Sequence, residues 1–225
     1  MQVIQPGFEI HKLASWEDML KHIEEIGRTC YKSNDLITED SHLRFIRGLI
    51  DRGHEAMIEH VAFSVCFTVD RGVTHEAVRH RLASFAQEST RYCNYSKEKH
   101  GGEIKYIDVE DVFKSHKAMQ TLDPDVVEAI IAEWVDACVD AEDHYMRMLA
   151  LGCPPELART VLNHSTAATL WVTMNIRSWR HFFSLRACET TGKAHPQMKE
   201  VTIPLLKQLQ EECPTLFGDL KLKEE

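Results

Sequence analysis

A stretch of 14 residues, Arg79 to Tyr92, concentrates side chains that bind anions. It holds three arginines, one histidine and two serines. Guanidinium groups bind phosphate oxygens in pairs, and hydroxyl and backbone N–H groups complete such a site. Within it, Gln87 offers both a donor and an acceptor to the edge of a base. The alternative is a solvated basic stretch whose surface ion pairs contribute little, and composition alone does not separate the two.

A second group of basic residues lies between positions 175 and 186, where three arginines occur without an acid. Arg177 and His181 are four residues apart and share a helix face. Arg186 instead falls on the aromatic, core-facing stripe of that helix, where a charge is costly unless it is paired. Either it forms a structural ion pair, with Glu189 or Glu156, or it is held in a partly dry pocket for a polar ligand.

The sequence contains no complete metal-binding or hydrolase motif. The segment His75-Glu76-Ala77-Val78-Arg79 begins like H-E-x-x-H but has arginine where the second histidine must stand. His54 and His60 are six residues apart, so on a helix they would point to different faces. No P-loop, Rossmann glycine motif or G-x-S-x-G is present. We therefore expect no metal site.

Hydrophobic periodicity and capping residues predict the elements that position these groups. We expect an α+β fold in which one mixed, mainly antiparallel sheet is flanked by helices, with a long helical segment, in a single domain over residues 1–225. Asp70 to Gly72 is a predicted turn, and Ser84 to Ser96 is expected to be irregular. Helices are predicted over 15–26, 41–52, 74–81, 123–151, 154–162, 177–188 and 195–213, and strands over 61–69, 104–107 and 168–176.

The net charge limits the classes of partner that the protein is expected to bind. The 225 residues include 26 basic and 35 acidic ones, a net charge of −9. This disfavours a nucleic-acid polymer or an anionic membrane as partner. Residues 108–156 alone hold twelve acids and three bases, so the arginine groups lie in a part of the chain that is neutral overall. No signal peptide is expected, and the seven cysteines form no C-x-x-C pair, which favours reduced thiols in a cytoplasmic protein.

Arg79-His80-Arg81, followed by seven residues and Ser89, resembles the R-H-R-x7-S signature of the flavin-dependent thymidylate synthases. The order and spacing agree over roughly residues 45 to 200. The further matching pieces are Gly53-His54-Glu55, Glu59-His60, Arg91-Tyr92, Glu156-x-x-Arg159, Asn175-x-Arg177 and Leu185-Arg186.

The resemblance implies a homotetramer with active sites between subunits. It also implies FAD as hydride carrier, NADPH as reductant, methylene-tetrahydrofolate as carbon donor, and conversion of dUMP to dTMP without a cysteine nucleophile. We accordingly expect Cys93 and Cys153, which lie near the motifs, to be packing residues. His54 and Tyr92 are candidates for a position near the flavin.

Residue roles follow from the same resemblance. Arg186 would be the catalytic residue at the uracil, where a cation favours loss of the N3 proton; a fixed guanidinium ~4 Å away is worth up to ~4 kcal/mol at an effective dielectric near 20. The residues that would hold dUMP are Glu76, Ala77, Val78, Arg79, Gln87, Glu88, Ser89, Thr90, Arg91, Arg159 and Arg186. The residues that would contact FAD are Arg79, His80, Arg81, Gln87, Asn175, Ile176, Arg177 and His181. The positions that depart from the family pattern are Glu76, Ala86, Gln87 and His181.

Two other functions remain open at this point. A non-catalytic nucleotide-phosphate-binding module would bind dUMP without consuming NADPH. An RNA-binding domain could use the same arginines, but the acidic total disfavours it.

Overall fold

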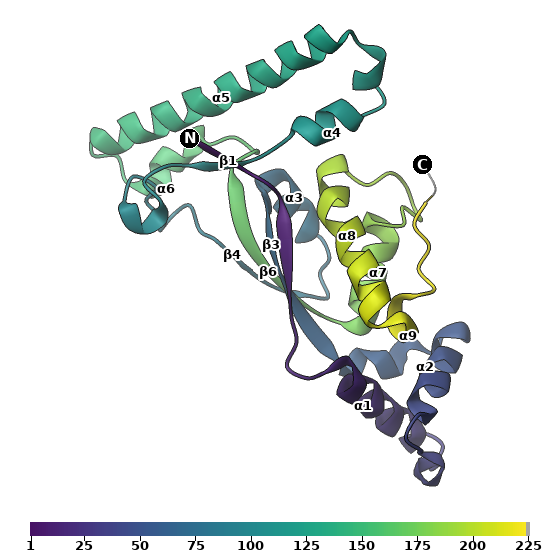
Figure 1. Ribbon diagram of the computed structural model, residues 1–225. Coiled ribbons are helices and arrows are strands. Elements are labelled where there is room, and N and C mark those ends of the chain that lie inside the picture. The colour runs from purple at the N-terminus through teal and green to yellow at the C-terminus, as the bar shows by residue number, and fades with distance from the viewer. Residues whose placement is uncertain (224–225) are drawn as a thin grey trace. The chain divides into compact units, whose positions relative to one another are not determined.

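Two compact units make up the chain in a computed structural model that describes residues 1–223 (Figure 1). The first unit comprises Met1–Gly7, Phe67–Arg79 and Ala86–Leu170. The second comprises Phe8–Cys66, His80–Phe85 and the described part of Trp171–Glu225. Each unit is therefore assembled from segments that are distant in sequence.

A four-stranded sheet has the order β2-β3-β6-β4. Its two long strands, β3 (Ala62–Asp70) and β6 (Ala167–Asn175), pair antiparallel, because Arg71 N donates to Thr166 O at one end and Ile176 N donates to Val61 O at the other. A separate two-stranded parallel sheet pairs β1 with β5. The α+β class is thus confirmed, and the parallel pairing lies outside the main sheet. The remaining strands are β1 (Gln2–Ile4), β2 (Gly7–His11), β4 (Ser84–Gln87) and β5 (Lys105–Ile107).

The helices of the second unit cover an aromatic core. Trp179 is fully buried, stacks on Phe63 with ring centroids 5.1 Å apart, and donates its indole N–H to the carbonyl of Phe63. Phe182, Phe183 and Phe217 pack around this pair. These helices are α1 (Trp16–Thr29), α2 (Ser41–Asp51), α7 (Ile176–Arg186), α8 (Pro196–Glu212) and α9 (Pro214–Phe217), with 3-10 turns at Asn34–Leu36 and Glu55–His60.

The first unit is built around the longest helix, α5 (Pro124–Ala150). Asp123 caps its start by accepting from Asp125 N at 2.9 Å, and Gly152, with φ +92°, follows its end. Beneath it lies a core of Tyr95, Ile104, Tyr106, Cys138, Tyr145 and Ala158. The other helices of this unit are α3 (Arg71–Ala77), α4 (Glu110–Ser115) and α6 (Pro155–Ala158), with 3-10 turns at Glu98–His100, Met119–Thr121 and Arg159–Val161.

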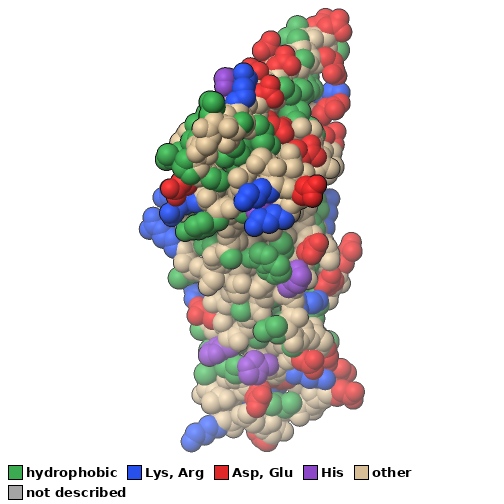
Figure 2. Space-filling model, turned by 90° about the vertical axis from the view of Figure 1, so that its left-hand side faces the viewer, with side chains coloured by type: hydrophobic (Ala, Val, Ile, Leu, Met, Phe, Trp, Pro, Cys, Tyr) green, Lys and Arg blue, Asp and Glu red, His purple; other side chains and the backbone are tan. Residues whose placement is uncertain are grey.

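Helix α5 carries a row of exposed acidic side chains. Figure 2 shows acidic side chains near the top of the view, the end at which α5 lies in Figure 1, and others in the lower half. The exposed acids on this helix are Asp125, Glu128, Glu133, Asp136, Asp140 and Asp143. Within residues 1–223, no helix is both long enough and apolar enough to cross a bilayer.

Several sequence-based expectations around the signature were wrong. Asp70 does not start a turn; it caps α3, accepting from Val73 N at 2.7 Å, and the helix begins at Arg71. The helix ends at Ala77 and not at Arg81, so the signature lies on a loop. Part of the expected irregular region is strand β4.

Candidate active site

A single turn after β4 carries three of the candidate nucleotide-binding residues. The carbonyl of Ser89 accepts from the backbone N–H groups of Tyr92 at 3.1 Å and Cys93 at 2.9 Å, and the Ser89 hydroxyl accepts from Arg91 N at 3.3 Å. Thr90 is buried in this turn, while the side chain of Arg91 is half exposed. The turn therefore holds its hydroxyl groups in place and presents a guanidinium to solvent.

A second arginine reaches the same turn from a distant part of the chain. Arg159, which follows α6, lies with Nη1 3.4 Å from the hydroxyl of Thr90, 69 residues earlier in sequence. Glu156 Oε2 lies 3.8 Å from Arg91 Nη2, and both side chains are 52% exposed. An exposed pair at that distance is weak, so a phosphate can compete for Arg91. Arg91 and Arg159 together form a site suited to an anion.

The neighbours of this turn are held from within the first unit. Gln87 Nε2 donates to the hydroxyl of Thr74 on α3 at 3.1 Å. Glu88 accepts at its carboxylate from Tyr95 Oη at 2.5 Å and at its carbonyl from Arg71 Nη2 at 3.2 Å. The side chain of Glu88 is thus engaged inside the protein.

The remaining candidates of the first unit lie at the carboxyl end of α3. The carbonyl of Glu76 accepts from Arg79 N at 3.2 Å, which closes the last turn before the signature. Ala77 is buried, whereas Val78 and Arg79 are exposed. The start of the signature is therefore accessible to a ligand.

In the second unit, Arg186 and His80 meet. Arg186 Nε donates to His80 Nε2 at 3.1 Å. A guanidinium has no acceptor, so Nε2 of His80 is unprotonated and the ring's proton lies on Nδ1. Burial, then the positive charge of Arg186 and finally His181 lower the pKa of His80 to about 4. The hydrogen bond therefore orients the Arg186 guanidinium through a neutral partner near pH 7.

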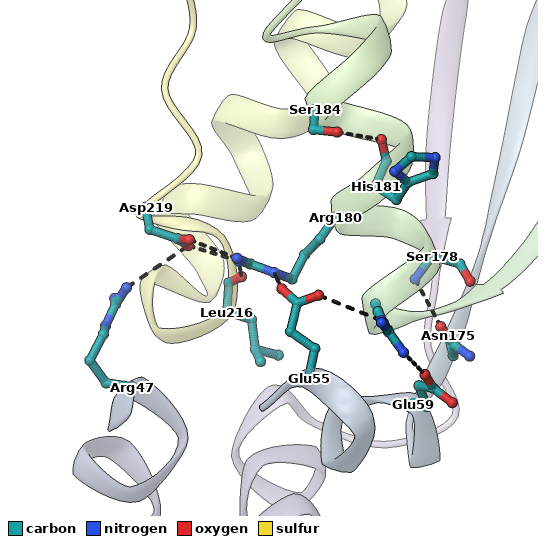
Figure 3. Close-up of polar contacts among 11 residues, drawn as sticks. Arg47, Glu55, Glu59, Asn175, Ser178, Arg180, His181, Ser184, Leu216 and Asp219 are labelled. Atoms are coloured by element: carbon teal, nitrogen blue, oxygen red, sulfur yellow. Dashed lines mark hydrogen bonds and ion pairs between the residues drawn. The ribbon is translucent and has the colours of Figure 1, made fainter. Parts of the chain in front are cut away.

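Helix α7 and its cap position Arg186 and four further candidates, of which His181 is exposed. Asn175 caps the helix, accepting from Ser178 N at 2.9 Å, and leaves its Nδ2 group as a donor (Figure 3). Ile176 is fully buried, and the exposed Arg177 lies 2.5 Å from Glu59 Oε1. The hydrogen bond with Glu59 raises the pKa of Arg177. At the other end of the helix, the carbonyl of Arg186 accepts from Thr202 Oγ1 of α8 at 2.9 Å.

Arg180, from the same helix, has a structural environment. Its guanidinium is buried and binds Asp219 with two parallel hydrogen bonds of 2.7 and 2.6 Å. It also donates to the carbonyl of Leu216 and to Glu55 (Figure 3). Two carboxylates compensate its charge, so Arg180 ties the segment after α9 to the core of the second unit.

The model for the family described as thymidylate synthase complementing protein matches residues 12–215. The chain belongs to the flavin-dependent thymidylate synthase family. A flavin-dependent thymidylate synthase of Corynebacterium aurimucosum is 31% identical over 219 residues, covering 96% of this chain and 84% of that relative. One from Mycolicibacterium vanbaalenii is 31% identical over 215 residues, covering 89% and 79%.

A solved structure has the same fold. A UMP/dUMP methylase, PolB, of Streptomyces cacaoi, crystallised with 5-bromo-dUMP, superposes with a TM-score of 0.77 at 22% identity, covering 97% of this chain and 96% of that one.

The residues expected from the resemblance to flavin-dependent thymidylate synthases divide between the units. All the dUMP candidates except Arg186 lie in the first unit. The FAD candidates lie in the second unit, apart from Arg79 and Gln87. The boundary falls at the peptide bond between Arg79 and His80, inside the signature.

Sequence reasoning missed the residues that support the site. Thr74, Arg71 and Tyr95 hold Gln87 and Glu88, and Thr202 holds the end of α7. Polar residues at buried positions of a helix, such as Thr74 and Thr202, are the signal that could have found two of them. Among the described residues, no group of three or more His, Cys, Asp or Glu side chains is arranged to hold a metal ion.

Proposed function

We propose that this protein is a flavin-dependent thymidylate synthase, which converts dUMP to dTMP with methylene-tetrahydrofolate as carbon donor and NADPH as reductant. The observation that carries the proposal is the orientation of Arg186 by a neutral histidine of the signature. This hydrogen bond fixes the position of Arg186 Nε, and an arginine stays charged near pH 7. Family membership supports the same activity.

The phosphate of dUMP binds at the turn after β4. Arg91 and Arg159 supply guanidinium groups, and Ser89 and Thr90 supply hydroxyl and backbone donors. Arg79 and the end of α3, with Glu76, Ala77 and Val78, border the nucleotide. Gln87 is held by Thr74 at its amide nitrogen, so its Oε1 atom is left as an acceptor for an N–H group of the ligand.

Arg186 acts at the uracil ring. Its positive charge favours the ring that has lost the N3 proton, and the resulting negative charge enriches the carbon that accepts the methyl group. A lysine could lose its proton in such a site, whereas an arginine stays charged. The residues described here provide this activation without a cysteine.

The second unit offers donors that fit FAD. Arg81 and Arg177 present exposed guanidinium groups, and His181 presents an exposed imidazole. The Nδ2 group of Asn175 and the Nδ1–H of His80 add neutral donors. Such a set suits a pyrophosphate and a carbonyl-bearing ring. When bound, FAD supplies the hydride that it receives from NADPH. We assign it to these residues together with Arg79, Gln87 and Ile176.

We propose that residues 1–225 form a single flavin-dependent thymidylate synthase domain, as the family resemblance implies. We further propose that the protein is a cytoplasmic homotetramer with its active sites between subunits, as the family resemblance implies.

The proposal predicts a yellow protein, or one that becomes yellow with FAD, whose NADPH oxidation is stimulated by dUMP. The nucleotide-binding module would bind dUMP, measured by calorimetry, without any change in NADPH oxidation. An RNA-binding domain would show RNA affinity that falls steeply with salt, and a flat salt dependence removes it. A colourless preparation that is indifferent to FAD would contradict the proposal.

A further inference from the structure

The turn that carries Ser89, Thr90 and Arg91 is closed at its base by a side-chain hydrogen bond. Tyr95 Oη donates to Glu88 Oε1 at 2.5 Å, and the six residues between them include the whole turn. Tyr95 is only 7% exposed and Glu88 is half-buried, so this bond is partly buried. We call it the Glu88–Tyr95 clasp.

Both ends of the clasp are anchored in the first unit. On one side, Glu88 N donates to Thr169 O of β6 at 3.0 Å. On the other, Tyr95 lies in the core cluster beneath α5, where its N–H lies 3.4 Å from Tyr145 Oη. Both ends of the turn are therefore fixed to the first unit.

Arg71 completes the base of the turn. It donates to the carbonyl of Glu88 at 3.2 Å, and its guanidinium also interacts with the Tyr95 hydroxyl. Burial, followed by the hydrogen bond to Glu88, raises the pKa of Tyr95 despite the opposing charge of Arg71. The phenol thus keeps its proton and remains a donor to the carboxylate.

The clasp also affects the repulsion between Glu88 and a bound phosphate. Glu88 is adjacent to Ser89, and a carboxylate turned toward a bound phosphate would repel it. The hydrogen bond from Tyr95 turns this carboxylate inward. The same interaction therefore both shapes the turn and holds the carboxylate oriented toward Tyr95.

We propose that Glu88 and Tyr95, supported by Arg71, are positioning residues that hold the turn in the shape that binds the phosphate of the nucleotide. The inference rests on the proposed function, in which the turn binds dUMP. In this proposal, the carboxylate of Glu88 lies behind the turn and does not contact dUMP directly. Binding improves because the turn is ordered before the ligand arrives.

The test compares dUMP with deoxyuridine, which lacks the phosphate, by calorimetry on the full-length protein. We expect Tyr95→Phe and Glu88→Leu each to weaken dUMP binding about tenfold, with deoxyuridine binding unchanged. Glu88→Gln keeps an acceptor for the phenol and should bind dUMP nearly as the wild type does. Tyr95→Phe combined with Glu88→Leu should bind no more weakly than Tyr95→Phe alone. The control is Tyr31→Phe, at a tyrosine that is 70% exposed.

A ligand-free measurement keeps the inference separate from the proposed function. Trypsin should cut after the exposed Arg91 faster in Tyr95→Phe and in Glu88→Leu than in the wild type, with circular dichroism confirming that each variant is folded. If the wild type does not bind dUMP, the proposed function fails while the trypsin result still reports on the clasp.

Three results would overturn the inference: unchanged dUMP binding in both variants, equal losses for dUMP and deoxyuridine, or a loss in Glu88→Gln with none in Tyr95→Phe. The last result would place Glu88 on the nucleotide. Unchanged cleavage in both variants would equally refute an ordering role.

Discussion

Arg186 Nε lies 3.1 Å from His80 Nε2, although the two residues are 106 positions apart in sequence. One belongs to the last turn of α7 and the other to the signature loop, and both lie in the second unit. His80, the histidine of the R-H-R triplet, thus orients Arg186, to which the resemblance assigns the catalytic role. This contact links the most recognisable motif of the chain to its proposed catalytic group.

Substitution of Arg186 should abolish turnover while sparing the fold. An upper limit of about 4 kcal/mol for a fixed guanidinium corresponds to a loss of up to about 10³-fold in kcat for Arg186→Ala. Arg186→Lys should retain part of the activity because it keeps the charge but lacks the planar fork. Initial rates of dTMP formation, with thermal unfolding as the control, measure this effect. Unaltered turnover in Arg186→Ala would show that the assignment is wrong.

His80 should make the protein sensitive to acid. Its pKa is about 4 in the folded protein against about 6.5 when unfolded. Only the unfolded chain therefore takes up a proton as the pH falls from 6.5 toward 4, and the folded state loses at most about 3 kcal/mol over that window. His80→Asn should lose less stability than the wild type between pH 7 and pH 4.5 in urea titrations. The exposed His22, changed to Asn, serves as the control, and parallel curves for wild type and His80→Asn would refute the shift.

Arg91 and Arg159 should act on the phosphate. We expect Arg91→Ala and Arg159→Ala each to weaken dUMP binding by about 10- to 100-fold, since a hydrogen bond to a charged group contributes about 1.5–3 kcal/mol. Arg147, an exposed arginine of α5, provides the matched control Arg147→Ala. Calorimetry measures the affinity of each variant for dUMP. If Arg91→Ala and Arg159→Ala bind dUMP as tightly as Arg147→Ala does, the phosphate site lies elsewhere.

Loss of the Arg180 ion pair should lower stability, whereas loss of Arg177 should mainly weaken flavin binding. Removing Asp219, as in Asp219→Asn, leaves the buried guanidinium of Arg180 poorly compensated and should lower the free energy of unfolding by about 3–5 kcal/mol. Arg177→Ala breaks two ion pairs of an exposed guanidinium, with Glu59 at 2.5 Å and with Glu55 at 3.6 Å, and should change stability by less than about 1 kcal/mol. Flavin retained after gel filtration should fall in Arg177→Ala. A stability loss of similar size in both variants would contradict this division.

The cysteines should be dispensable for the chemistry. Cys93 and Cys153 are free thiols, half-buried, and pack against the core of the first unit. Cys93→Ala and Cys153→Ala should therefore retain dTMP formation within a few-fold. Loss of activity in one variant, without loss of the folded state, would identify a nucleophile.

The sequence predicted the long elements well because their signals are local. The cap at Ser15, the start of α5 at Asp123 and the left-handed Gly53 after α2 are each set by a few neighbouring residues. Strand β4 escaped prediction because four residues of mixed polarity show no periodicity. The start of α3 was missed because Asp70-Arg71-Gly72 is compatible both with a turn and with an aspartate cap.

The candidate site was predictable only as a set of residues. Nothing local indicates that Arg186 meets His80, or that Arg159 meets Thr90, because these contacts depend on how the strands pair. Glu88, which the resemblance places among the dUMP residues, is a further example. No local pattern indicates that Tyr95 Oη donates to its carboxylate.

The most direct test of the proposed activity is a mass-spectrometric assay of dTMP with the purified protein, FAD, NADPH, methylene-tetrahydrofolate and dUMP. Each component is omitted in turn, and Arg186→Ala is run in parallel. We predict that dTMP forms only in the complete mixture and is lost in the variant. Binding of dUMP with neither dTMP formation nor NADPH oxidation in the complete mixture would contradict the account and favour a non-catalytic nucleotide-binding module.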